Sequence, residues 1–156
     1  MIKVPTTERK VSGGAYQHPE IFQTAVTVSD PQKHETEDGT FVDYKIEAES
    51  SFPHFAGKTY TCRRRYNDFV WLRAQLQKEI DRNDGPLPVR PLPELPNSES
   101  LFGWFTGERF TPEFIQKRMV DLDKWLNQVA NHDISCESKH LLAFFRDKSL
   151  TYYLDW

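Results

Sequence analysis

The spacing of hydrophobic residues along the chain changes once, near residue 66. Before that point, segments rich in β-branched and aromatic residues predict three strands, over 21–28, 41–48 and 58–65. The first strand is expected to stop at Asp30-Pro31, and residues 35–39 are expected to form the turn between the first two strands. Three strands this close in sequence favour an antiparallel sheet built from hairpins.

After residue 66 the apolar residues recur at intervals of three and four, which predicts three helices. The first is expected to begin just after Asn67-Asp68 and to stop at 83–86, the second to begin at Thr111-Pro112, and the third at Ser135. Their apolar faces are Phe69, Leu72, Leu76 and Ile80; Ile115, Met119, Leu122, Leu126 and Val129; and Leu141, Leu142, Phe144 and Phe145. This order predicts an α+β fold in which a three-stranded antiparallel sheet packs against a three-helix subdomain.

The length of 156 residues is that of one domain. We expect a flexible tail over 1–18, the folded domain over 19–149 and an aromatic-rich tail over 150–156. No apolar run approaches the roughly 20 residues of a membrane-spanning helix, and the N-terminus lacks the apolar segment of a secretory signal. Two cysteines, Cys62 and Cys136, favour a reducing compartment, and the net charge of −3 argues against nucleic acid as a general partner. These features favour a soluble domain inside the cell.

Three arginines and a tyrosine, Arg63 to Tyr66, stand at the predicted junction of the third strand and the first helix. Strand alternation places Arg63 and Arg65 on one face, with Cys62 and Arg64 on the other. The helix offers unpaired N–H groups at the same place, and guanidinium groups match a phosphate in geometry and charge. The pattern indicates a phosphate site in which Tyr66 forms a wall for a sugar or inositol ring. The alternative is a solvated run of surface charges paired with acids.

The segment 86–96 is rich in proline, which excludes a helix and favours a stiff polyproline II conformation. One interpretation is a rigid connector between the first two helices. Another is a ligand for SH3 domains, because Arg90, Pro93 and Pro96 have the spacing of an arginine followed by PxxP.

An apolar loop containing Leu101, Phe102, Trp104 and Phe105 separates the proline-rich segment from the second helix. These side chains either fold back on the core or dip into a bilayer interface, where Trp and Phe are frequent.

Patterns typical of catalysis are absent from the sequence, which contains no HExxH motif and no glycine-rich phosphate loop. Cys136 and His140 are four residues apart on the third predicted helix, but two ligands make a poor metal site. We therefore expect packing or surface roles for both, and the sequence predicts no enzyme, no cofactor and no metal site.

The order of these features resembles the PX domain of the sorting nexins, especially small nexins that consist of little more than that domain. The resemblance covers about residues 20–147 and is carried by the segments VDYKI, RRRYNDFVWLR and LPELP. It implies the PX fold and binding of phosphatidylinositol 3-phosphate. It also implies a role in protein sorting, in the cytoplasm and peripherally on early endosome membranes. Retromer or other sorting proteins are partners implied by the family alone.

Under this resemblance, Arg65 holds the 3-phosphate, Tyr66 packs against the inositol ring, and Arg118 bonds the ring hydroxyls. The loop from Leu101 to Phe105 becomes the membrane-inserting loop, and Arg63 is a further candidate for the headgroup. The family's lysine for the 1-phosphate is Ser98 here.

Because Ser98 stands where the family has this lysine, Arg90 or Arg109 is the candidate to bind the 1-phosphate in its place. The missing lysine also leaves a second function open. In that alternative, the chain is a protein-interaction module that keeps the fold, loses lipid binding and binds SH3 domains through its proline-rich segment.

Overall fold

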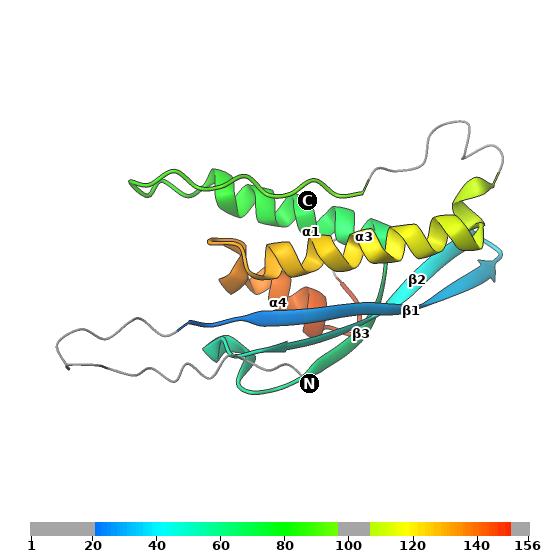
Figure 1. Cartoon of the computed structure of the whole chain (residues 1–156), viewed down its shortest axis with the longest axis horizontal. Coiled ribbons are helices and arrows are strands. Elements are labelled where there is room, and N and C mark those ends of the chain that lie inside the picture. The colour runs from blue at the N-terminus through cyan, green and yellow to red at the C-terminus, as the bar shows by residue number, and fades with distance from the viewer. Residues whose placement is uncertain (1–20, 97–106, 151–156) are drawn as a thin grey trace.

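The computed structural model describes residues 21–96 and 107–150 of the chain. It contains one antiparallel sheet in the order β1-β2-β3, with the helices together on one side of the sheet (Figure 1). The strands are β1 (Thr24–Thr36), β2 (Gly39–Ser50) and β3 (Tyr60–Arg65). The helices are α1 (Tyr66–Asp81), α3 (Pro112–Ala130) and α4 (Lys139–Arg146), with short 3-10 turns η1 (Pro53–Phe55), η2 (Glu108–Phe110) and η3 (Ser135–Glu137).

Strand β1 is longer than the sequence predicts, because it continues past Asp30-Pro31 to Thr36. The pairing with β2 shifts its register between Ser29 and Gln32, and Asp30 has a positive φ of 49°. This irregularity accommodates Pro31, which has no N–H to donate to a regular ladder. The expectation that the strand stops here was therefore wrong, whereas the predicted turn is confirmed by the pairing of Thr36 with Gly39.

Helix α3 covers the outer edge of β1 with polar side chains. Alternate N–H groups of a strand lie about 6.6 Å apart, and side chains four residues apart on a helix lie about 6 Å apart along its axis. The two spacings match, so successive turns of α3 each accept one N–H group of β1. The bonds run from Thr24 N to Asn131 Oδ1 (2.9 Å), from Val26 N to Asn127 Oδ1 (2.8 Å) and from Val28 N to Asp123 Oδ1 (2.8 Å).

Replacing Asn127 by alanine is expected to lower the free energy of unfolding by about 1–3 kcal/mol. The Asn127 amide pairs both the N–H and the carbonyl of Val26, and Val26 is buried. Urea denaturation measures the change, with Gln128→Ala, an exposed change on the same helix, as the matched control. Equal stability of the two variants would contradict the role given to this contact.

The predicted helical faces form the core. Ile80, Ile115, Met119 and Leu142 pack at its border, and the other predicted positions are buried. Helix α1 begins at Tyr66, before the expected start, because the Asp68 carboxylate in its first turn accepts from Arg65 N at 2.9 Å. The start of α3 is confirmed, with the Thr111 hydroxyl accepting from Phe114 N.

The third predicted helix is divided in the structure. Residues Ser135–Glu137 form η3, and α4 begins only at Lys139. Ser138 causes the break, because its extended backbone ends η3 and its hydroxyl accepts from His140 N and Leu141 N as the cap of α4.

The proline-rich segment is attached to the helices and contains neither helix nor strand over 86–96. Leu92 is buried, and the Pro93 carbonyl accepts from Trp125 Nε1 at 2.9 Å and from Arg73 Nε at 3.3 Å. These contacts on α1 and α3 support the connector interpretation.

Residues 1–20, 97–106 and 151–156 lie outside the described part of the chain. The expectations for both tails, for Ser98 and for the loop from Leu101 to Phe105 therefore fall mainly or wholly outside it. Within 21–96 and 107–150, no helix combines the length and the apolar character needed to cross a membrane.

Candidate functional site

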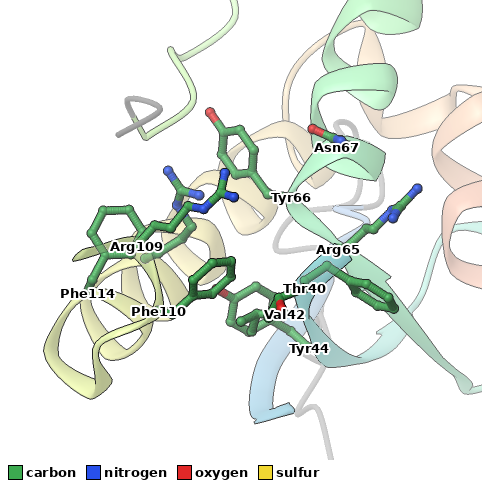
Figure 2. Close-up of a pocket in the computed structure, with 11 residues that line it drawn as sticks. Thr40, Val42, Tyr44, Arg65, Tyr66, Asn67, Arg109, Phe110 and Phe114 are labelled. Atoms are coloured by element: carbon green, nitrogen blue, oxygen red, sulfur yellow. The ribbon is translucent and has the colours of Figure 1, made fainter. Parts of the chain in front are cut away.

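A pocket of about 240 Å³ lies where β2, the start of α1, η2 and α3 meet (Figure 2). Tyr66 stands on one side, Tyr44 and Val42 on the other, and Arg65 and Arg109 lie at opposite ends in this view. The lining residues are Thr40, Phe41, Val42, Tyr44, Arg65, Tyr66, Asn67, Arg109, Phe110, Phe114 and Arg118.

The junction of β3 and α1 supplies Arg65 and Tyr66. Arg65 is the N-cap of α1 and has an extended backbone conformation. Its side chain therefore projects from the backbone beside the positive end of the helix dipole. Its guanidinium carbon lies 5.3 Å from the centre of the Phe41 ring. The Tyr66 hydroxyl donates to the Pro96 carbonyl at 2.7 Å, which fixes the ring as a wall of the pocket.

Helix α3 brings Arg118 to this wall from a distant part of the sequence. The Arg118 guanidinium carbon lies 4.0 Å from the centre of the Tyr66 ring and 4.6 Å from that of Phe114. Both distances are within the range of cation–π contacts. Arg65, Tyr66 and Arg118, which the family resemblance assigned to one site, therefore line one pocket.

A third arginine enters from η2. The Arg109 guanidinium carbon lies 4.7 Å from the centre of the Phe110 ring, and Lys33 Nζ lies 5.6 Å from the same ring. Arg109 therefore lines the Phe110 side of the pocket, whereas Lys33 is near the same ring but is not among the lining residues. From the sequence, Arg109 could be proposed only as a replacement for the family's 1-phosphate lysine, because no periodic pattern marks this short turn as part of a site.

The pocket is a positive site in a chain of net negative charge. Among the described residues that line it, three are arginines and none is acidic, and a guanidinium stays charged at any physiological pH. Burial raises the pKa of the Tyr44 hydroxyl, and the positive charge of Arg118 partly offsets this effect. The Tyr44 hydroxyl on the β2 side of the pocket is therefore neutral. Aromatic walls with converging guanidiniums suit a ring that carries phosphate groups.

Comparison with known proteins decides the family. The sequence profile of the PX domain matches residues 52–148. Sorting nexin-3 of Homo sapiens is 34% identical over 137 residues, which cover 86% of this chain and 79% of that protein. The chain belongs to the PX domain family.

Two further comparisons bear on this PX domain. Sorting nexin-30 of Danio rerio is 34% identical over 125 residues, which cover 80% of this chain and 27% of that protein. The chain thus spans about a quarter of the length of that relative. The structure of a designed CISK-PX domain has a TM-score of 0.57 and 22% identity, covering 77% of this chain and 96% of that one. The predicted α+β PX fold is confirmed.

Membership also indicates a class of ligand. PX domains of sorting nexins generally bind phosphoinositide lipids. The pocket lined by Arg65, Arg109 and Arg118 is the part of this PX domain whose chemistry fits such a ligand.

Two arginines expected at the headgroup lie elsewhere in this PX domain. Arg63 pairs with Asp43 at 2.8 Å and with Asp30 at 3.1 Å, and Arg90 pairs with Asp133 at 2.9 Å. Neither lines the pocket. The structure therefore does not bring Arg63 and Arg90 to the site, and Arg109 is the replacement candidate that it does bring there.

Arg64 has a structural role that the sequence did not reveal. Its predicted place on the face opposite Arg63 and Arg65 is confirmed, because it is only 3% exposed among the helices. Its Nε donates to the Phe144 carbonyl at 2.9 Å, and its Nη2 donates to the Asp147 carbonyl. Within one run of arginines, Arg63 forms a surface ion pair, Arg64 anchors the end of α4, and Arg65 lines the pocket.

Cys136 and His140 do not share one helix, because η3 and α4 are separate. Cys136 is buried, and His140 Nδ1 lies 2.9 Å from Glu79 Oε2 on α1. These are packing and surface contacts of the kind expected. Among the described residues, no three His, Cys, Asp or Glu side chains are grouped as metal ligands would be.

Proposed function

We propose that this PX domain binds phosphatidylinositol 3-phosphate and directs its protein to early endosome membranes for sorting. The observation that carries the proposal is the convergence of Arg65, Tyr66 and Arg118 on one pocket. The assignment to this lipid and to endosomes extends the general function of the family.

Each of the three residues has a separate task in this proposal. Arg65 binds the 3-phosphate with two parallel N–H···O bonds, aided by the positive end of α1. Tyr66, held by its bond to Pro96, packs against the inositol ring. Arg118, held against Tyr66, donates to ring hydroxyls. The aromatic contacts restrict both the ring and the guanidinium, which lowers the entropy lost when the headgroup is bound.

Sedimentation with liposomes tests the proposal directly. Liposomes containing phosphatidylinositol 3-phosphate are compared with liposomes of the same surface charge in which phosphatidylserine replaces it. Selective sedimentation with the first supports the proposal. Equal association with both, or none, would contradict it.

The loop from Leu101 to Phe105 is proposed as the second membrane contact. Its large apolar residues are typical of side chains that enter a bilayer interface. A headgroup pocket and an inserted loop are two weak contacts, and in combination they give reversible attachment.

Replacing Trp104 by alanine is expected to weaken binding to liposomes by roughly 10-fold or more, because a buried side chain of this size contributes about 1.5–3 kcal/mol. The preference for phosphatidylinositol 3-phosphate should remain, since the pocket is unchanged. Sedimentation on both kinds of liposome measures the two quantities separately. Loss of lipid preference with unchanged total binding would contradict this division of roles.

Protein partners are proposed from the family alone, with retromer or other sorting proteins as the candidates.

The contacts of the proline-rich segment argue against the alternative function as an SH3 ligand, because Leu92 is buried and the Pro93 carbonyl accepts a hydrogen bond from Trp125. Pulldown with SH3 domains, compared with Pro93→Ala, tests it. Binding to an SH3 domain that is lost in the Pro93→Ala variant would support the SH3-ligand alternative.

A further inference from the structure

An acidic residue, Asp43, lies directly opposite Arg65 in the sheet. The two residues are partners in the pairing of β2 with β3, and directly opposed residues of an antiparallel pair have α-carbons about 4.5–5.5 Å apart. Opposite charges at such positions attract each other across the strands. An ion pair with Asp43 would neutralise the guanidinium that the proposed function, on which this inference rests, assigns to the phosphate.

The Asp43 carboxylate is turned toward two other side chains. Arg63 Nε donates to Asp43 Oδ1 at 2.9 Å, and Arg63 Nη2 lies 2.8 Å from the same oxygen. His34 Nε2, on the other neighbouring strand, lies 3.0 Å from this oxygen. Asp43 is therefore held between β3 and β1, where its side chain is only 16% exposed.

The irregularity of β1 fixes the Arg63 guanidinium beside Asp43. Asp30, which has the positive φ at this irregularity, offers Arg63 both its carboxylate and its carbonyl. Arg63 Nη1 donates to Asp30 Oδ2 at 3.1 Å, and Nη2 donates to the Asp30 carbonyl at 2.6 Å. A planar guanidinium can bridge several acceptors in this way, whereas an ammonium group is a single point charge.

The Phe41 ring gives the Arg65 guanidinium a different neighbour from Asp43. Phe41 is on the central strand, where His34 is its pairing partner on β1 and stacks on the ring at 4.8 Å. The Arg65 guanidinium carbon approaches the same ring from β3, 5.3 Å from its centre. A cation–π contact leaves the guanidinium charged and its N–H groups available to an anion.

We propose that Arg63 is a positioning residue for lipid binding, which holds Asp43 away from Arg65 and so preserves the Arg65 charge for the phosphate. Arg63 does not line the pocket and acts only through Asp43. When Arg63 is removed, Asp43 turns to Arg65, its partner across the strands, and the headgroup has to displace this carboxylate.

Arg63→Gln tests the inference on the two kinds of liposome described above. Its affinity for liposomes with phosphatidylinositol 3-phosphate should fall by about 5- to 10-fold, because the lipid competes with an ion pair at a partly buried site. Adding Asp43→Asn should restore the affinity to within about twofold of the unmodified chain, since the residue opposite Arg65 is then neutral.

The matched control adds Asp30→Asn to Arg63→Gln. This double variant has the same net charge as the rescued one and changes the other acid that Arg63 contacts. We expect no rescue, because Asp30 is not the residue opposite Arg65. Equal rescue by the two asparagines would show an effect of net charge and overturn the inference.

Three further outcomes separate the inference from the proposed function. Unchanged lipid binding in Arg63→Gln would overturn the inference, and so would a loss that Asp43→Asn does not restore. A crystal structure of Arg63→Gln provides a readout without lipid, in which the Arg65 guanidinium should lie within ion-pair distance of Asp43. An unmoved Arg65 would overturn the inference. Absence of selective binding by the unmodified chain would refute the proposed function, and the crystal structure would still decide whether Arg63 keeps Asp43 from Arg65.

Discussion

Replacing Arg65 by alanine is expected to abolish selective binding to phosphatidylinositol 3-phosphate, with a loss of affinity of roughly 100-fold or more. A bidentate arginine–phosphate contact contains two hydrogen bonds to charged groups, each worth about 1.5–3 kcal/mol, and about 1.4 kcal/mol corresponds to a factor of ten. Sedimentation with liposomes containing or lacking the lipid measures both the affinity and the selectivity.

Two variants isolate the cause of the Arg65 effect. Arg65→Lys keeps the charge but loses the planar pair of donors, so it should recover only part of the affinity. Arg82→Ala removes an exposed charge outside the pocket and should bind like the unmodified chain. If Arg65→Ala kept its lipid preference, the assignment of the phosphate to this end of the pocket would be wrong.

Replacing Arg64 by alanine is expected to cost about 3 kcal/mol or more of the free energy of unfolding. The change removes bonds to the carbonyls of Phe144 and Asp147 and also the packing of the guanidinium against the Phe144 ring, 5.5 Å from its centre. Buried acceptors left without a donor cost about 1–3 kcal/mol each. Thermal unfolding should shift downward by roughly 10 °C.

The neighbouring Arg63 provides the matched control for Arg64. Arg63→Ala removes a partly exposed ion pair with Asp30 and Asp43 and should cost less than about 1 kcal/mol. Arg64→Met restores most of the packing but none of the hydrogen bonds, so its stability should lie below that of the unmodified chain. Full stability of Arg64→Met would show that the carbonyl bonds contribute nothing.

The apolar faces of the helices could be predicted because their signals are local. The apolar residues of α1, α3 and α4 repeat within each segment, and the hydroxyl of Thr111 caps α3 where the sequence places it. The course of β1 beyond Asp30 was missed for the opposite reason. A proline normally ends a strand, and only the pairing with β2 across the register shift carries this strand past it.

The arginines show the same limit at the site. Strand alternation separates Arg64 from Arg63 and Arg65, and the structure agrees. Alternation cannot tell Arg63 from Arg65, because the partners of Arg63 are Asp30 and Asp43, which only the folded sheet brings near. Arg90 likewise meets Asp133 from 43 positions away. Arg109 reaches the pocket through a 3-10 turn, which has no hydrophobic period to reveal it.

The attachment of α3 to β1 has a consequence for recognition. The helix carries Arg118 in its first half, the edge-binding Asp123 and Asn127 in its second half, and the edge-binding Asn131 at its C-cap. Because these three side chains hold the helix to the sheet, the backbone that bears Arg118 is preorganised relative to the β2 floor. Ligand binding then has to order mainly side chains, at about 0.5–1.5 kcal/mol each, and no movement of whole elements is required.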